Sequence, residues 1–290
     1  MRPVNQVQRA RPLLGTLVRI TVQASLAPAE LHAAVDAAFA EVALVHALMS
    51  WHDADSELSR LNRLAVESVQ PLHLHTRSVL EAALVFAERS EGAFDPCVAG
   101  ILTRWGLLPD PALSRLPQLP AVQGSWRDIE LSAEGVRFHR PLWLDLGGIA
   151  KGFAVDLAVR CLQRLGIEDI VVNAGGDLRV AGVREHEVAI RHPQSAHALV
   201  HELLLNNEAL ATSSAFESRC DVIEGSVCAL VDPGSGKAYG GQDSVSVRAP
   251  TCMTADALTK VALFAPSAVA EAVFQHCQAH CIRLEPQPES

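Results

Sequence analysis

The order in which helices and strands are predicted constrains the fold of this chain most strongly. Apolar residues recur at three- and four-residue steps over residues 29–49, which predicts a helix with one face in the core. Further along, strand patterns and helical patterns follow one another without the regular βαβ order of a doubly wound sheet. The sequence therefore predicts an α+β fold, with mixed strands and helices in two closely packed lobes.

The individual elements are predicted from hydrophobic periodicity and from helix and turn signals. Strands are expected at residues 13–22, 129–131, 135–138, 142–146, 170–173, 178–180, 187–191, 200–205, 227–231 and 244–248. Helices are expected at residues 29–49, after a cap at Asp55 or Ser56, from a cap at Thr76 to Gly92, and at residues 149–165, 254–264 and 266–281. Residues 174–177 (AGGD) predict a tight glycine turn between two strands.

Length and composition indicate one globular unit. The chain has 290 residues, of which 49% are hydrophobic and 20% charged, which is ordinary for a folded protein and unlike a disordered one. We expect a single domain over residues 1–290. Four prolines lie between residues 109 and 120; they exclude regular structure there and predict a surface excursion that marks the boundary between the lobes.

The charge and the cysteines limit the classes of partner and compartment. The formal net charge is -9 and no basic cluster is present, so no nucleic acid partner is expected. The N-terminal residues lack the apolar region of a signal peptide, and no apolar run approaches the roughly 20 residues that span a bilayer. Seven dispersed cysteines without a C-x-x-C pair indicate reduced thiols. We therefore expect a soluble, cytoplasmic protein with no membrane span.

The segment at residues 142–152 (LWLDLGGIAKG) carries the strongest chemical signal. It reads as a strand that passes through two glycines into the first turn of a helix. Glycines let the backbone approach a phosphate, the helix N-terminus adds partial positive charge, and Lys151 adds a full one. The pattern is neither a Walker motif nor G-x-G-x-x-G. By itself it is equally compatible with a plain strand-to-helix turn and a solvated lysine.

Three further segments each place a carboxylate beside a turn or a helix start. They lie at residues 92–96 (GAFDP), 173–177 (NAGGD) and 254–258 (TADAL). One such acidic residue is usually only a helix cap. Several of them in one chain, together with a phosphate-type turn, indicate a site that binds both a phosphate and a divalent cation.

These segments together resemble a known family. The blocks RPLLGT, MSWHDADSELSRLN, GAFDP, DLGGIAKGFAVD, VNAGGD, ATSS, VDP-x-x-G and ADAL occur in the order seen in the ApbE family of FAD:protein FMN transferases, from about Arg11 to Leu263. The resemblance implies a magnesium-dependent reaction that breaks the FAD pyrophosphate. AMP leaves, and FMN becomes a phosphoester on a Thr or Ser of an acceptor flavoprotein.

The resemblance also assigns residues. It places the flavin nucleotide at Ala93, Phe94, Asp95, Asp145 and Lys151, with Leu14 where a Met is often found, and with Trp51 and His52 where an aromatic ring stacks on the cofactor. Trp51 is the better stacking surface, although it would serve equally well as a packed residue at the end of the preceding helix. The metal ligands would be the carbonyl of Gly148, Asp256, and the position held here by Lys260. Asp232 or Asp177 would assist the acceptor hydroxyl as a catalytic residue.

Two departures from the family pattern fall on chemically important positions. Lys260 stands where the family has a metal-ligating Thr, and an ammonium group cannot ligate a cation. It could pair with Asp256 one turn earlier, or place its own charge on the pyrophosphate in place of magnesium. Ala229 stands where a His is common, and residues 214–216 (SAF) replace Gly-Asp-Tyr.

Two functions therefore stay open from the sequence. One is an active FMN transferase; the other is an FAD-binding protein of the same fold with weak or no transfer. A purely structural interaction module would leave the GAFDP and DLGGIAKG blocks unexplained.

Overall fold

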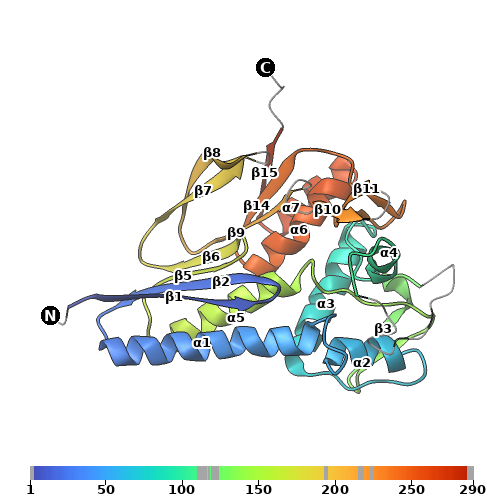
Figure 1. Cartoon of the computed structure of the whole chain (residues 1–290), viewed down its shortest axis with the longest axis horizontal. Coiled ribbons are helices and arrows are strands. Elements are labelled where there is room, and N and C mark those ends of the chain that lie inside the picture. Colours follow the sequence, from blue (N-terminus) through green and yellow to red (C-terminus); the bar gives the residue numbers. More distant parts are fainter. Residues whose placement is uncertain are drawn as a thin grey trace.

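A single antiparallel sheet organises the molecule (Figure 1). The computed structural model describes residues 3–109, 116, 118, 124–192, 195–214, 219–222 and 225–285. Within them, seven strands pair in the order β1-β2-β5-β6-β9-β14-β15. Their bounds are β1 Asn5–Leu13, β2 Thr16–Ala24, β5 Asp169–Ala174, β6 Asp177–Gly182, β9 Ala209–Ser214, β14 Ser244–Ala249 and β15 His280–Leu284. This sheet with its helices confirms the predicted α+β class.

Three helices cover one face of the sheet. They are α1 (Pro28–Met49), α5 (Ala150–Arg164) and α6 (Cys252–Phe264). Figure 1 shows α1 and α5 running side by side along the β1-β2 hairpin, with α6 next to β9 and β14. The inward side chains form one large apolar cluster in which Ile20, Phe39 and Leu258 are completely buried. Burial of this continuous core is what fixes the helices on the sheet.

A second hairpin covers part of the opposite face. Strands β7 (His186–His192) and β8 (Ser195–Leu205) pair with each other, and Ile190 and Leu205 pack on Leu178, Val180 and Leu210 of the sheet. Strands β6 and β9 are therefore buried on both faces. This explains why their patterns are nearly continuous in apolar or small residues rather than alternating.

The remaining elements pack beyond one end of α1 and α5 (Figure 1). They are α2 (Glu57–Leu64), α3 (Leu74–Arg89), α4 (Ala99–Arg104), the short 3-10 helix η1 (Trp126–Asp128), and the pairs β3 (Ile129–Leu131) with β4 (Val136–Phe138), β10 (Arg219–Val222) with β11 (Gly225–Cys228), and β12 (Val231–Asp232) with β13 (Lys237–Ala238). Helix α7 (Ser267–His276) connects α6 to β15.

Residues 142–146 do not form the predicted strand. The side chain of Asn62 in α2 donates to the Leu144 carbonyl (3.0 Å) and accepts from the Leu144 amide (2.7 Å), and the Asp145 amide donates to the Pro96 carbonyl (2.7 Å). The backbone groups of this extended segment are thus satisfied by an amide side chain and a loop. An apolar run alone could not reveal a partner more than eighty residues away.

Several predicted boundaries also change. Helix α2 is capped by Ser56 as expected, but the cap of α3 is His73 rather than Thr76. The predicted strand at 227–231 divides between β11 and β12. The predicted helix 266–281 ends at His276, because the chain turns at Gln278 (φ 52°) and pairs with β14. Strands β1 and β9 were not anticipated.

The expectation that no apolar run could span a membrane is wrong for α1. By length and composition alone, this helix is long and apolar enough to do so. In the fold it packs against β1, β2 and α5, and its residues Leu31, Val35 and Phe39 are completely buried. Its apolar side chains therefore serve the core.

Most of the predicted lobe boundary at residues 109–120 lies outside the described residues. No disulfide is formed among the six cysteines whose side chains are described, namely Cys97, Cys161, Cys228, Cys252, Cys277 and Cys281.

Candidate functional site

A cavity of about 540 Å³ opens where two hairpin turns meet the start of α5 and the middle of α6. Its volume lies within the range of ordinary ligand pockets, roughly 300–1,000 Å³. Twelve of the thirteen residues that the sequence proposed as site residues line it: Leu14, Trp51, His52, Ala93, Phe94, Asp95, Asp145, Gly148, Lys151, Asp177, Asp256 and Lys260. The fold thus brings together groups spread over almost 250 positions of the chain.

The two hairpin turns have the backbone that such tight turns require. In the β1-β2 turn, Leu14 and Gly15 have φ of 56° and 71°, and in the β5-β6 turn Gly175 and Gly176 have φ of 67° and 106°. A bulky residue such as Leu14 rarely adopts positive φ, so its place at a cavity is a point of local strain. A Cβ on Gly175 would lie 2.5 Å from Thr16 Oγ1, so only glycine allows the two turns to touch.

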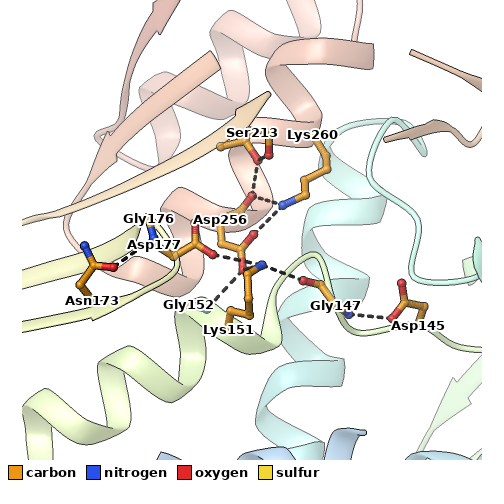
Figure 2. Close-up of polar contacts among 11 residues, drawn as sticks. Asp145, Gly147, Lys151, Gly152, Asn173, Gly176, Asp177, Ser213, Asp256 and Lys260 are labelled. Atoms are coloured by element: carbon orange, nitrogen blue, oxygen red, sulfur yellow. Dashed lines mark hydrogen bonds and ion pairs between the residues drawn. The ribbon is translucent and has the colours of Figure 1, made fainter. Parts of the chain in front are cut away.

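Lys151 extends from the first turn of α5 toward the β5-β6 turn (Figure 2). Its ammonium group lies 3.1 Å from Asp177 Oδ2 and 3.8 Å from Asp256 Oδ2, and it donates to the Gly147 carbonyl (3.2 Å). Burial alone would lower the pKa of Lys151, but the two carboxylates outweigh it and raise that pKa above its ordinary value. Lys151 is therefore a permanent cation in the cavity wall.

Asp256 and Lys260 lie one turn apart on α6. The Lys260 ammonium donates to Asp256 Oδ1 (2.5 Å) and to the Asp256 carbonyl (3.0 Å), as Figure 2 shows. Asp256 Oδ2 accepts from the Gly152 amide at 3.2 Å. Burial raises the pKa of Asp256, but the ammonium groups of Lys151 and Lys260 outweigh it and leave the pKa below its ordinary value. The predicted ion pair between Asp256 and Lys260 is confirmed.

Asp177 behaves differently from Asp256. Burial raises the pKa of Asp177, and the neighbouring Asp256 carboxylate raises it further, against the opposing effect of Lys151. A carboxyl group with a raised pKa at a cavity wall is suited to take up a proton during a reaction.

Helices α5 and α6 lie so close together that a carboxylate on each helix accepts hydrogen bonds from backbone amides of the other. A Cβ on Gly152 would lie 2.3 Å from the Cys252 carbonyl oxygen, so this contact requires glycine. Behind the cavity, Asp156 of α5 accepts from the amides of Cys252 (3.0 Å) and Met253 (2.9 Å) at the start of α6, and from Arg179 Nη1 (2.7 Å). Asp156 thereby fixes the position of α6 and of the two cavity residues on it.

The loop before α5 is closed by Asp145, whose Oδ1 accepts from the Gly147 amide at 2.9 Å. The loop leaves Gly147 and Gly148 on the cavity wall beside the positive end of α5. Burial raises the pKa of Asp145, and the cations Lys151 and Lys260 act against that rise. The arrangement keeps the predicted phosphate-type turn, although the segment before it is not a strand.

The aromatic residues Trp51 and Phe94 expose little ring surface to the cavity. Trp51 is 4% exposed and packs edge-on against Trp143, with ring centroids 5.9 Å apart. Phe94 is 5% exposed and packs edge-on against Phe86. The packed interpretation of Trp51 is thus the one that this geometry favours. His52 is the exposed member of the pair Trp51-His52 and also lines the cavity.

Asp95 lies at the cavity with its carboxylate held by backbone amides. It accepts from Cys97 (2.8 Å) and from Trp126 (3.4 Å), and burial raises its pKa. Asp95 therefore shapes the loop that carries Ala93 and Phe94.

Asp232 is the one proposed site residue that does not line the cavity. Its carboxylate accepts from the Gly234 amide (3.0 Å) and from Ser235 Oγ (2.6 Å), which closes the β12-β13 turn. Its neighbours Val231 and Pro233 line the cavity, and so does Ala229. Of the two catalytic candidates, the geometry favours Asp177.

Sequence reasoning missed the contribution of β9. Thr212, Ser213 and Ser214 line the cavity, and Ser213 shares a hydrogen bond of 2.7 Å with Thr259 of α6. The block ATSS was recognised, but its strand was not, because short hydroxyl residues give a weak strand pattern. The run of small residues ALATSS was the available signal.

The residues implied as metal ligands do not fit a magnesium ion as they stand. Magnesium requires about six oxygen ligands at roughly 2.0–2.1 Å. Asp256 Oδ1 is instead occupied by the Lys260 ammonium, and Asp256 Oδ2 by the Gly152 amide. Within the part of the chain that the structure describes, no group of three or more His, Cys, Asp or Glu side chains could hold a metal ion.

Comparison with known proteins places this geometry in context. A model of the ApbE family matches residues 14–282. The FAD:protein FMN transferase of Treponema pallidum is 30% identical over 88% of this chain and 77% of its own length, and that of Vibrio cholerae is 29% identical over 89% and 80%.

Solved structures agree with the sequence relatives. The ApbE protein of Thermotoga maritima superimposes with a TM-score of 0.83 at 26% identity, covering 96% of this chain and 94% of that protein. The flavin transferase ApbE of Vibrio cholerae gives a TM-score of 0.79 at 26% identity, covering 97% and 94%. The matched region contains all of the cavity residues named above.

Proposed function

Because the chain belongs to the ApbE family, we propose that it is an FAD:protein FMN transferase that attaches FMN to a Thr or Ser of an acceptor flavoprotein. The sequence relatives named above carry this activity in their names. The observation that supports it most directly is the cavity in which Lys151, Lys260, Asp177 and Asp256 meet at the start of α5.

The proposed reaction exchanges the phosphoanhydride bond within FAD for a phosphoester bond on the acceptor. The hydroxyl oxygen of the acceptor Thr or Ser bonds to the phosphorus of the FMN half of FAD. The bond from that phosphorus to the bridging oxygen breaks, and AMP leaves with the bridging oxygen and its electron pair. The hydroxyl proton passes to a base. No redox step is involved, so the chain has only to place the groups and stabilise charge.

Lys151 and Asp177 have complementary roles in this reaction, because one stabilises negative charge and the other accepts a proton. The Lys151 ammonium would stabilise the charge that develops on the pyrophosphate oxygens. Asp177 Oδ2 lies 3.1 Å from that ammonium, so a carboxylate able to accept the hydroxyl proton stands beside the phosphate position. The raised pKa of Asp177, caused by burial and by Asp256, makes it a better proton acceptor than an ordinary surface Asp.

A second cavity offers a route for the acceptor segment. It has a volume of about 450 Å³ and lies between the β5-β6 turn, β7 and β9. Gly175, Thr212 and Ser214 line both cavities. A Thr or Ser arriving through the second cavity would meet the nucleotide beside Asp177.

The resemblance also implies a magnesium requirement. Both carboxylate oxygens of Asp256 already accept from donors within the chain, so no step of the proposed reaction is assigned to the metal.

The test is to incubate the purified chain with FAD and the acceptor protein of one of the named relatives. We expect flavin fluorescence on the acceptor band after denaturing electrophoresis, a mass increase equal to FMN, and release of one AMP for each acceptor modified. FAD binding without any of these three products would contradict transfer.

The alternative is an FAD-binding protein without transfer. Ala229 supports it, because the structure places this residue in the cavity wall and it has no proton to move. The two functions share the binding step and differ only in AMP release. Ala229→His separates them, since a rise in AMP release in this variant from none to a measurable rate would show that the natural chain only binds FAD.

A further inference from the structure

The chain contains only three lysines, Lys151, Lys237 and Lys260, and otherwise uses arginine for its basic side chains. Two of the three line the same cavity, within reach of the same carboxylate. An ammonium group is a compact point charge with three donors, unlike the planar guanidinium. The distribution therefore indicates a specific need for ammonium groups at this cavity.

The Lys260 ammonium lies among the groups that the family resemblance implies as metal ligands. It contacts both the side chain and the carbonyl of Asp256. A Cβ built on Gly148 would lie 3.3 Å from Lys260 Cε and 3.8 Å from Nζ. The cation thus stands between Asp256 and the Gly147-Gly148 loop, where the phosphate is expected.

Lys260 is held in that place by its surroundings. Its side chain is 18% exposed, and Asp256 is 1% exposed and one turn earlier on the same helix. An acidic residue four positions before a lysine is the favourable order for a helical ion pair. The ion pair with Asp256 uses two of the three ammonium protons, which leaves one proton for an anion in the cavity.

A metal ion and this ammonium group would compete for one position. A dication bound to Asp256 Oδ1 at roughly 2.1 Å would lie close to an ammonium that is itself 2.5 Å from the same oxygen. Repulsion between two cations at such a separation is strong in a buried site. Displacing Lys260 would also leave its charge without the Asp256 partner.

We propose that Lys260 is a built-in replacement for the divalent cation, so that this chain binds the pyrophosphate of FAD with two lysine ammonium groups and without magnesium. The inference rests on the proposed function for the identity of the ligand. Lys260 carries one positive charge where magnesium carries two. The chain therefore places less positive charge beside the pyrophosphate, but its binding of FAD does not depend on the metal supply.

The test measures FAD binding to the full chain by quenching of flavin fluorescence, once with a chelator and once with millimolar magnesium. For the natural chain we expect the dissociation constant to differ by less than about twofold between the two conditions. For Lys260→Thr we expect weak binding in chelator and at least about tenfold tighter binding in magnesium, because the variant gains a metal ligand and loses a charged contact.

Two controls separate charge from metal binding. Lys260→Met keeps an unbranched side chain without charge or oxygen, and should lose affinity that magnesium does not restore. Lys237→Thr makes the same change as Lys260→Thr at an exposed lysine outside the cavity, and should behave like the natural chain. Thermal unfolding of each variant verifies that it is folded.

A second readout follows the metal directly. Manganese suits the same oxygen ligands as magnesium and is detected by electron paramagnetic resonance. With FAD present, we expect no stoichiometric manganese on the natural chain and one ion for each chain of Lys260→Thr.

The outcomes distinguish the two proposals. Magnesium-dependent FAD binding, or one manganese ion for each natural chain, would overturn the role of Lys260 and leave the proposed function standing. Absence of FAD binding to the natural chain in both conditions would overturn the proposed function and the role of Lys260 with it.

Discussion

Helices α5 and α6 carry two sets of ion pairs that lie close together and are used differently. Behind the cavity, Asp156 is bound by two fixed backbone amides and by Arg179, and it is 3% exposed. At the cavity, Asp256 is bound by one amide and by Lys260, and Lys151 lies between Asp177 and Asp256. Both sets join α5 to α6, but only the second faces a space that can hold a ligand.

The two sets of ion pairs differ in whether the groups bound to the carboxylate can also bind a ligand. Backbone amides at a helix start are fixed in place by the helix and have no partner within it, so the Asp156 set is structural. Lysine side chains turn about several bonds, and each ammonium has three donors that can be shared with a phosphate. A buried charge cluster can thus serve binding when its cations are lysines in a cavity wall.

The strongest test of this contrast is Asp156→Ala. Removing one partner of a buried pair typically costs about 3–5 kcal/mol, and here it would leave Arg179 and two helix amides without their acceptor. We expect a loss of that size in the free energy of unfolding, measured by urea titration. Asp36→Ala is the matched control, because Asp36 pairs with Arg9 and Arg11 at the surface, where solvent and salt screen the charges and such pairs contribute little to stability. Equal losses of unfolding free energy in Asp156→Ala and Asp36→Ala would contradict a structural role for the Asp156 set.

At the cavity, Asp177→Asn should affect rate rather than folding. Loss of a general base costs typically about 10²–10⁴-fold, so we expect AMP release to fall by about a hundredfold. FAD affinity should not weaken, because the variant removes a negative charge beside the pyrophosphate. A parallel loss of FAD binding and of stability would instead place Asp177 with Asp156 as a structural residue.

The pH dependence of AMP release tests the same assignment of Asp177 as the base. Asp177 accepts a proton only when ionised, so AMP release should rise with pH through the pKa of Asp177. Burial and the Asp256 carboxylate raise that pKa, so the acid limb should lie above the ordinary range of Asp. We expect the limb in a pH profile of AMP release from the natural chain and its absence in Asp177→Asn. A limb that persists in the variant would assign it to another group.

Lys151→Ala should weaken FAD binding by about tenfold, the effect expected for one lost hydrogen bond to a charged group. The measurement is quenching of flavin fluorescence, with Lys237→Ala as the control at an exposed lysine. Unchanged affinity in Lys151→Ala would mean that its contacts with Asp177 and Asp256 only hold the fold together.

The smallest expected effect concerns the second cavity. Leu17→Trp would enlarge a half-exposed side chain that lines it, and we expect transfer to the acceptor to slow several-fold while FAD affinity stays the same. Val183→Trp, at a position 81% exposed outside both cavities, is the control. Normal transfer by Leu17→Trp would show that the acceptor approaches from elsewhere.

Much of the fold could be predicted from local patterns. The periodicity of residues 29–49 and the AGGD turn gave α1 and the β5-β6 hairpin, because both signals lie within one element. The predictions failed where distant partners decide the backbone: Asn62 holds residues 142–146 out of a sheet, and β14 draws residues 280–284 into one. Local propensity is outweighed in such places by pairing that the sequence does not display.

The sequence by itself predicted which residues would lie together, since motif order named thirteen residues and the fold gathers twelve of them around one cavity. It could not determine how their charges are shared. Only the tertiary structure showed that Asp232 closes its own turn, that Asp156 ties α6 to α5, and that the Lys151 ammonium lies between Asp177 and Asp256. The physical reason is distance: charges interact strongly only within a few ångströms in a buried site, and separations of that kind arise only when the chain has folded.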